Sequence, residues 1–249
     1  MNLKFSPYSY SKINTYKNCP YRFKLQYIDK IKTPFVMNKS LEKGSFLHKG
    51  IELYLKDEIK KIADFEFKVY NDEEKSKLFK QLKKILKNDN IQYYKTKENL
   101  YIEKGFGLDI DTLEVKDYNY DSDIIGFIDL MFYDEDEKIV YIIDHKSGKF
   151  NENQDKIQLY IYYLVALSLF PAEKAKLYFD FIEHNKSISF EFDKSEKEKI
   201  QNEVKKIIEM IEMSSSFPKK DTFCNWCPYF EHNICDGNAD TPEMELDIF

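Results

Sequence analysis

The chain has little glycine, proline or arginine, and each shortage excludes a class of protein. Seven glycines and seven prolines among 249 residues exclude collagen-like chains and disordered chains rich in these residues. Arg22 is the single arginine, so bidentate readout of base edges is hardly available. Neither an apolar run of about 18 residues nor the apolar segment of a secretory signal occurs. We therefore expect a protein without membrane contact in the cytoplasm, or in the host-cell cytoplasm if it is viral.

The net charge of −6 is unevenly distributed along the chain. Residues 1–49 carry ten basic groups against Asp29 and Glu42, a local balance of +8 that leaves −14 for the remainder. A basic segment on an acidic body could follow a phosphate backbone, although a lysine-rich solvated surface explains the same charges. Because lysine far outnumbers arginine, we expect any nucleic acid to be bound through its backbone, without strong sequence preference.

Hydrophobic periodicity predicts helices first, then a meander of strands, then further helices and strands. We expect helices over 10–16 with Ser9 as cap, 20–28, 41–62, 72–88, 153–170 and 194–213. We expect strands over 99–103, 110–117, 122–133, 138–146, 174–183 and 187–192. The sequence DEDEK at 134–138 predicts a hairpin turn. This order indicates an α/β fold with a mixed sheet rather than a doubly wound one.

Two aspartates lie in apolar strands, where an unpaired carboxylate is costly to bury. Asp129 lies within GFIDLMF (126–132), and Asp144 lies within YIIDHKSGK (141–149). Lys146 is two residues after Asp144 and therefore on the same face of its strand. In two hairpin registers Asp129 lies opposite Asp144, directly or diagonally, whereas a third register puts them on opposite faces.

This pattern has two explanations. Two converging carboxylates without a nearby thiolate suit Mg²⁺ or Mn²⁺, which could polarise a phosphodiester and lower the pKa of a bound water. Lys146 would then orient that water and stabilise charge on the phosphorane. Alternatively, Lys146 forms a buried salt bridge with Asp144 or Asp129 and has no catalytic role.

Four short motifs follow one another along the chain: GSFLH (44–48), GFID (126–129), DHK (144–146) and QLYIY (158–162). Together they resemble the ordered motifs of the PD-(D/E)XK nuclease superfamily, specifically its RecB-type branch. That branch includes the nuclease domains of RecB and AddB, viral exonucleases and CRISPR-adaptation nucleases. The resemblance implies a restriction-endonuclease-like mixed β-sheet flanked by helices, and a metal-dependent deoxyribonuclease that is an exonuclease rather than an endonuclease.

The resemblance also implies roles for single residues. The implied metal ligands are His48, Asp129, Asp144 and, through its backbone carbonyl, His145. The implied catalytic residues are Asp129, Asp144, Lys146, Gln158 and Tyr162. Gln158 and Tyr162 are four apart and share one helix face, from which they would position the DNA backbone and the lysine, although hydrogen bonds to a strand explain them as well. Glu103, on a strand before GFID, is left out of the ligand set because its register is open.

The four cysteines are Cys19, Cys224, Cys227 and Cys235. Cys224 and Cys227 have the CxxC spacing that lets two thiolates bind one metal centre. Spacing leaves zinc, an iron–sulfur cluster and free buried thiols open, whereas disulfides are not expected in the cytoplasm. The resemblance to AddB implies a [4Fe-4S] cluster, which would staple the N-terminal helices to the C-terminal segment.

We expect a single nuclease domain over residues 1–239 and a flexible acidic tail over 240–249. The expected parts of the domain are a cysteine-cluster subregion (1–30 and 220–236), a helical insertion (41–90) and a catalytic core (99–213). The expected substrate is DNA, at ends or single-stranded, in recombination, repair, replication or CRISPR adaptation. The tail could bind a protein partner. The alternative function is a non-catalytic DNA-binding or assembly subunit that retains the fold.

Overall fold

A six-stranded sheet in the order β2-β1-β3-β4-β5-β6 forms the centre of the computed structural model, which describes residues 3–34, 39–60, 65, 72–220 and 224–237. The strands are β1 (Tyr101–Leu108), β2 (Val115–Lys116), β3 (Ile124–Asp134), β4 (Ile139–Lys146), β5 (Lys174–Phe181) and β6 (Lys186–Asp193). β4 and β5 run parallel, and the other neighbours are antiparallel. The predicted mixed sheet is therefore confirmed.

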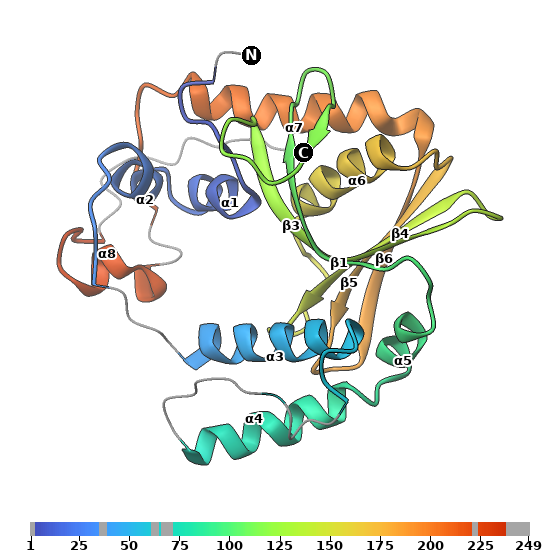
Figure 1. Ribbon diagram of the computed structural model, residues 1–249. Coiled ribbons are helices and arrows are strands. Elements are labelled where there is room, and N and C mark those ends of the chain that lie inside the picture. The colour runs from blue at the N-terminus through green and yellow to red at the C-terminus, as the bar shows by residue number, and fades with distance from the viewer. Residues whose placement is uncertain (1–2, 35–38, 61–64, 66–71, 221–223, 238–249) are drawn as a thin grey trace.

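Helices cover both faces of this sheet (Figure 1). The helices on one face are α1 (Tyr10–Asn18), α6 (Ile157–Leu169) and α7 (Lys197–Glu212). Those on the other face are α3 (Lys39–Leu55), α4 (Asp72–Ile85) and α5 (Asp89–Lys95). The short helical segments are α2 (Pro20–Phe23), a π-helix (Lys24–Ile28), two 3₁₀ turns (Lys194–Glu196 and Cys224–Trp226) and α8 (Pro228–Glu231). The arrangement confirms a restriction-endonuclease-like α/β architecture.

Each face of the sheet has its own hydrophobic core. α6 connects the parallel strands β4 and β5, and its central residues Leu164 and Val165 are fully buried between the sheet and the neighbouring helices. On the other face, Phe46 and Leu82 join α3 and α4 to the sheet. Burying one such side chain contributes about 1.5–3 kcal/mol, so both helical layers are held firmly against the strands.

The first predicted helix has the predicted cap, whereas the third ends early. The Ser9 hydroxyl accepts a hydrogen bond from the backbone N–H of Lys12 at 3.2 Å. α3 ends at Leu55 instead of continuing to residue 62, because Asp57 adopts a left-handed conformation with φ 60°. The chain then turns back and buries Ile59 in the core beneath α3.

The prediction of a strand over 110–117 is wrong for most of its length. The Asp109 carboxylate accepts hydrogen bonds from the backbone N–H groups of Asp111 and Thr112, at 3.0 and 2.8 Å, and closes a turn. Val115 and Lys116 then pair with the end of β1. α5, which the sequence did not predict, follows α4 directly.

The strand predicted over 99–103 is β1, which begins at Tyr101 and continues five residues further, to Leu108. The remaining predicted elements occur within a few residues of their expected bounds, and the DEDEK segment forms the turn between β3 and β4. The predicted acidic tail, 240–249, lies outside the described residues. Within the described part of the chain, no helix combines the length and apolarity needed to cross a membrane.

Candidate functional site

Two carboxylates face each other across β1 and β3. Lys104 pairs with Ile128 in this antiparallel ladder, so the preceding residue, Glu103, is opposite the following one, Asp129. The ladder is interrupted at that position, where Glu103 has a φ of 50°. A left-handed conformation is costly for a residue with a side chain, and it typically persists at functional sites.

A third carboxylate continues this row onto β4. The β3–β4 ladder ends at the pair Leu130 and Ile143, so its register carries Asp129 directly opposite Asp144. Of the three hairpin registers that the sequence left open, the structure has the one in which Asp129 is directly opposite Asp144. Glu103, Asp129 and Asp144 therefore occupy matching positions on three adjacent strands.

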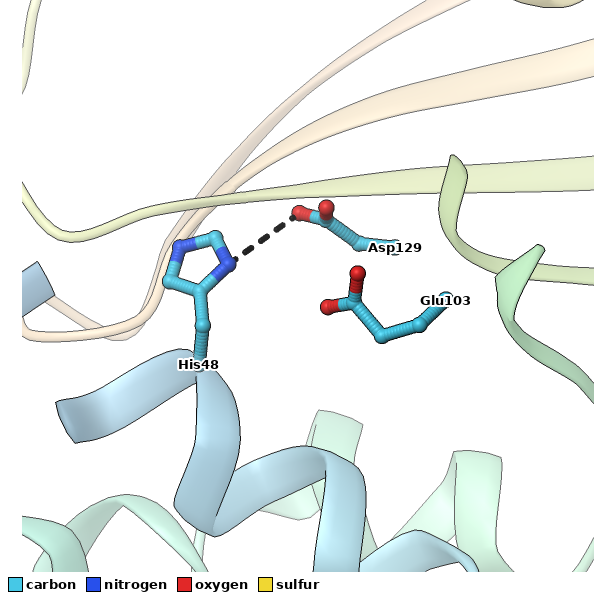
Figure 2. Close-up of side chains that lie close together, drawn as sticks. All are labelled: His48, Glu103 and Asp129. Atoms are coloured by element: carbon cyan, nitrogen blue, oxygen red, sulfur yellow. Dashed lines mark ion pairs between the residues drawn. The ribbon is translucent and has the colours of Figure 1, made fainter. Parts of the chain in front are cut away.

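The imidazole of His48 approaches this row from α3. Ligand atoms of His48, Glu103 and Asp129 all lie within 4.8 Å of one another, and Figure 2 shows the three side chains pointing together. Nδ1 of His48 is 3.6 Å from Oδ2 of Asp129. Gly44, one turn earlier, lets the helix come close, because a Cβ there would be 3.0 Å from the Ser147 hydroxyl. The glycine and the histidine of GSFLH thus both face the sheet, the glycine at Ser147 and the histidine at Asp129.

The acids of this site are protonated more readily than ordinary carboxyl groups. Burial, and then the charge of Asp144, raise the pKa of Asp129 to about 8. Burial and the nearby Glu52 raise the pKa of Glu103, and burial raises that of Asp144 against the opposing effect of Lys146. Buried acids that repel one another are stabilised by a cation, so the site has the electrostatics of a cation-binding centre.

His48 is neutral at physiological pH. Burial, and then the positive charges of His145 and Lys146, lower its pKa to about 4. Its contact with Asp129 is therefore not an ion pair near pH 7. A neutral imidazole offers the lone pair that a metal ion requires.

Lys146 begins a chain of polar contacts that joins β4 to α6 and returns to β3. Its Nζ lies 2.6 Å from Oδ2 of the buried Asp144 and donates to Oε1 of Gln158 at 2.8 Å. Nε2 of Gln158 donates to the Tyr162 hydroxyl at 2.8 Å, and that hydroxyl donates to the backbone carbonyl of Phe127 at 2.7 Å. The salt bridge anticipated for Lys146 is present, and the two α6 residues extend it.

His145 contacts the site through its backbone. Its N–H donates to Oδ2 of Asp129 at 2.8 Å, while its side chain is buried beside Asp180, with 3.6 Å between Nδ1 and Oδ2. The imidazole is thus outside the group formed by His48, Glu103 and Asp129. A role for the carbonyl of His145 stays a prediction.

Two differences separate the predicted ligand set from the group that the structure brings together. Among the described residues, the group with three ligand atoms within 4.8 Å contains Glu103, whereas Asp144 lies outside it. Glu103 was left out because its register was open. The signal that identifies it is the pairing of its strand with the one carrying Asp129.

The four cysteines lie together in the structure, and none of them belongs to the carboxylate site. Cys19, Cys224, Cys227 and Cys235 all line one cavity of about 20 Å³ between α2 and the C-terminal segment. The two segments are also joined directly, because the Tyr229 hydroxyl donates to the backbone carbonyl of Ile31 at 2.9 Å. In the described part of the chain no three of the sulfurs lie within 4.8 Å of one another.

Comparison with known proteins gives one family match. A family model described as the PD-(D/E)XK nuclease superfamily matches residues 7–236. No curated protein matches the chain. A solved structure titled "Crystal structure of SSO0001" is 17% identical, covers 77% of this chain and 94% of its own, and has a TM-score of 0.36.

Proposed function

This chain belongs to the PD-(D/E)XK nuclease superfamily, and from that premise we propose that it is a metal-dependent deoxyribonuclease. Membership implies a nucleic-acid substrate. The observation that carries the proposal is the row of carboxylates Glu103, Asp129 and Asp144, with the ammonium of Lys146 beside the last. We assign it to the RecB-type branch, as an exonuclease on DNA ends or single strands in recombination, repair, replication or CRISPR adaptation.

The donor set fits a hard divalent cation. His48 supplies a neutral nitrogen, and Glu103 and Asp129 supply carboxylate oxygens, a combination without thiolate that suits Mg²⁺ or Mn²⁺. We propose that Asp144 and the backbone carbonyl of His145 also contribute. When bound, such an ion polarises the phosphodiester and lowers the pKa of a water molecule.

We propose that Lys146 is the catalytic lysine. Its ammonium would orient the attacking water and stabilise the negative charge that develops on the phosphorane. Gln158 accepts a hydrogen bond from Nζ and fixes its direction, and Tyr162 in turn fixes the amide of Gln158. Tyr162 is itself held by a strand carbonyl, so the lysine is oriented by the rigid sheet rather than by a loop.

We propose that the four cysteines bind a [4Fe-4S] cluster that joins residues 1–30 to residues 220–236. The shared cavity supports a common centre. Its role is structural, within one nuclease domain over residues 1–239.

The proposal is tested by degradation of end-labelled single- and double-stranded DNA in Mn²⁺ or Mg²⁺. Lys146→Ala is expected to lower the cleavage rate at least about 100-fold while DNA binding persists. Lys174→Ala is the matched control, because Lys174 begins the adjacent strand and pairs with the exposed Glu191. Lys146→Met, which keeps the length of the side chain, serves if the alanine variant does not fold. A native protein that binds DNA but cleaves none of it with either ion contradicts the proposal and favours a non-catalytic subunit.

A further inference from the structure

Three aromatic rings pack together at the surface, although burial would stabilise each of them. Phe127, Tyr118 and Tyr120 are 47%, 37% and 68% exposed. The rings of Phe127 and Tyr118 stack with centroids 4.8 Å apart, and Tyr120 packs edge-on against Tyr118 at 5.5 Å. We name these three residues the aromatic shelf. An exposed apolar cluster of this kind typically marks a binding surface.

Two glycines on β1 hold the shelf in place. Gly105 pairs with Phe127, and a Cβ at Gly105 would lie 3.0 Å from the Phe127 ring and 3.2 Å from Cβ of Tyr118. Gly107 shares that strand face and lets the loop that carries Tyr118 pack closely, since a Cβ there would be 2.1 Å from the Ser122 hydroxyl. The rings therefore rest on the backbone of the sheet, which fixes their position.

The shelf lies next to the proposed cleavage site. Phe127 precedes Asp129 by two residues, a separation of roughly 7 Å along β3. That spacing is comparable to the length of one nucleotide. The carbonyl of Phe127 also accepts the hydrogen bond of Tyr162, the last member of the chain that begins at Lys146.

A cavity connects the two features. All three shelf residues line a cavity of about 470 Å³, and Gln158 and Tyr162 line the same cavity. Its volume is within the range of pockets that bind small molecules. A group resting on the shelf is thus in one continuous space with the residue that orients Lys146.

The charge around the shelf selects which part of a nucleotide it would contact. The loop that carries Tyr118 and Tyr120 also carries two exposed acids. Asp117 pairs with Lys104 at 3.1 Å, and Asp121 repels phosphates. A nucleobase has no charge and stacks on aromatic rings whatever its sequence. We propose that the aromatic shelf binds a nucleobase of single-stranded DNA, one nucleotide from the phosphodiester that is cut. This inference rests on the proposed function and specifies how that site takes its substrate.

The inference is tested by binding of a fluorescein-labelled oligothymidylate of about 12 nucleotides, measured by fluorescence anisotropy in EDTA. A series of the same oligomer carries one abasic spacer at successive positions. At one position, loss of the base is expected to weaken binding to the native protein about 5- to 150-fold, the range for one base stacked on aromatic rings. Phe127→Ala and Tyr118→Ala should weaken binding of the intact oligomer by a similar factor, and should have no further effect on that abasic oligomer.

Three variants separate stacking from a general structural effect. Phe127→Leu keeps an apolar side chain and should bind like the alanine variant, whereas Phe127→Trp should retain the binding of the native protein. Tyr101→Ala is the matched control, because Tyr101 is 38% exposed on the same β1 strand but packs against Phe170 outside this cavity. It should leave the affinity unchanged.

Several outcomes would overturn the inference. Equal affinities of the native protein, Phe127→Ala and Tyr118→Ala would do so, as would the same loss on intact and abasic oligomers. A dimer that the two alanine variants disrupt, seen by light scattering, would assign the shelf to a second copy instead. A protein whose binding requires both the rings and the base, but which cleaves no DNA, contradicts the proposed function alone. A protein that cleaves DNA without ring dependence contradicts this inference alone.

Discussion

The backbone N–H of His145 on β4 donates a 2.8 Å hydrogen bond to Oδ2 of Asp129 on β3. The same oxygen lies 3.6 Å from Nδ1 of His48 on α3. Asp129 is therefore oriented by the main chain of the neighbouring strand at the point where the β3–β4 ladder ends. Because the donor belongs to the backbone, the sheet itself positions the Asp129 carboxylate. Substitution of the surrounding side chains therefore leaves this hydrogen bond in place.

Glu103→Gln is expected to weaken Mg²⁺ or Mn²⁺ binding about 10- to 100-fold, because it removes a negative ligand from the group with His48 and Asp129. Isothermal titration calorimetry measures the affinity directly. Glu98→Gln, an exposed acid shortly before β1, is the control and should bind the ion like the native protein. Equal affinities of the Glu103 variant and the native protein would exclude Glu103 as a ligand.

The stability of the metal-free protein is expected to fall as pH rises from about 4 to 8. Asp129 has a pKa of about 8 in the folded protein against 3.8 ordinarily, so the folded state binds more protons than the unfolded state over this range. Stability falls with pH wherever the folded state binds more protons, and the raised pKa of Asp144 acts in the same direction. Thermal denaturation in EDTA at pH 5 to 8 measures this slope.

Mg²⁺ should then raise the melting temperature more at pH 8 than at pH 6, because the ion and the proton compete for the same carboxylates. Asp129→Asn cannot ionise at this position and should flatten the slope in EDTA. An equal Mg²⁺-induced shift at both pH values would contradict the assignment of Asp129 as an ion ligand.

Tyr162→Phe is expected to reduce both stability and activity. It removes the hydroxyl between the Gln158 amide and the Phe127 carbonyl, at a cost of about 1–3 kcal/mol in the free energy of unfolding. With Gln158 less restrained, kcat should fall about 10-fold. Tyr163→Phe is a close control, because Tyr163 is the next residue of α6 and its buried hydroxyl donates to the backbone carbonyl of Asp193 at the end of β6.

The two phenylalanine variants are compared by urea denaturation and by DNA cleavage. Both should lose stability, but the Tyr163 variant should keep its kcat. A similar loss of activity in both would show that Tyr162 acts through the fold and not through Lys146.

Anaerobically purified protein is expected to be brown and to contain about four iron and four sulfide atoms per chain. Cys19→Ser should lower the iron content and reduce the free energy of unfolding by up to about 5 kcal/mol, because a link from Cys19 to Cys224 closes a very long loop. Trp226→Ala, a substitution of a 76% exposed residue between two of the cysteines, should change neither quantity. Zinc without iron in the native protein would contradict the cluster.

Local sequence signals were sufficient for several elements. Ser9 was predicted as a helix cap because serine is preferred at that position, where its hydroxyl accepts a backbone hydrogen bond, and the structure confirms it. The turn at 134–138 and the apolar helix α6 were also predicted, because turn chemistry and a run of apolar residues act over a few positions. By contrast, residues 110–117 resemble a strand in composition, yet a turn forms there. The Asp109 carboxylate accepts hydrogen bonds from the backbone N–H groups of Asp111 and Thr112.

The sequence by itself determined the order of the motifs, the α/β class and the presence of Asp129, Asp144 and Lys146 on a strand hairpin. The tertiary structure alone decided that Glu103 joins His48 and Asp129, while Asp144 contacts Lys146. The physical reason is that alternation along a strand assigns side chains to faces but not to partners. Partners depend on the register between strands and on the left-handed backbone at Glu103, both of which are fixed by packing of the whole sheet between its two layers of helices.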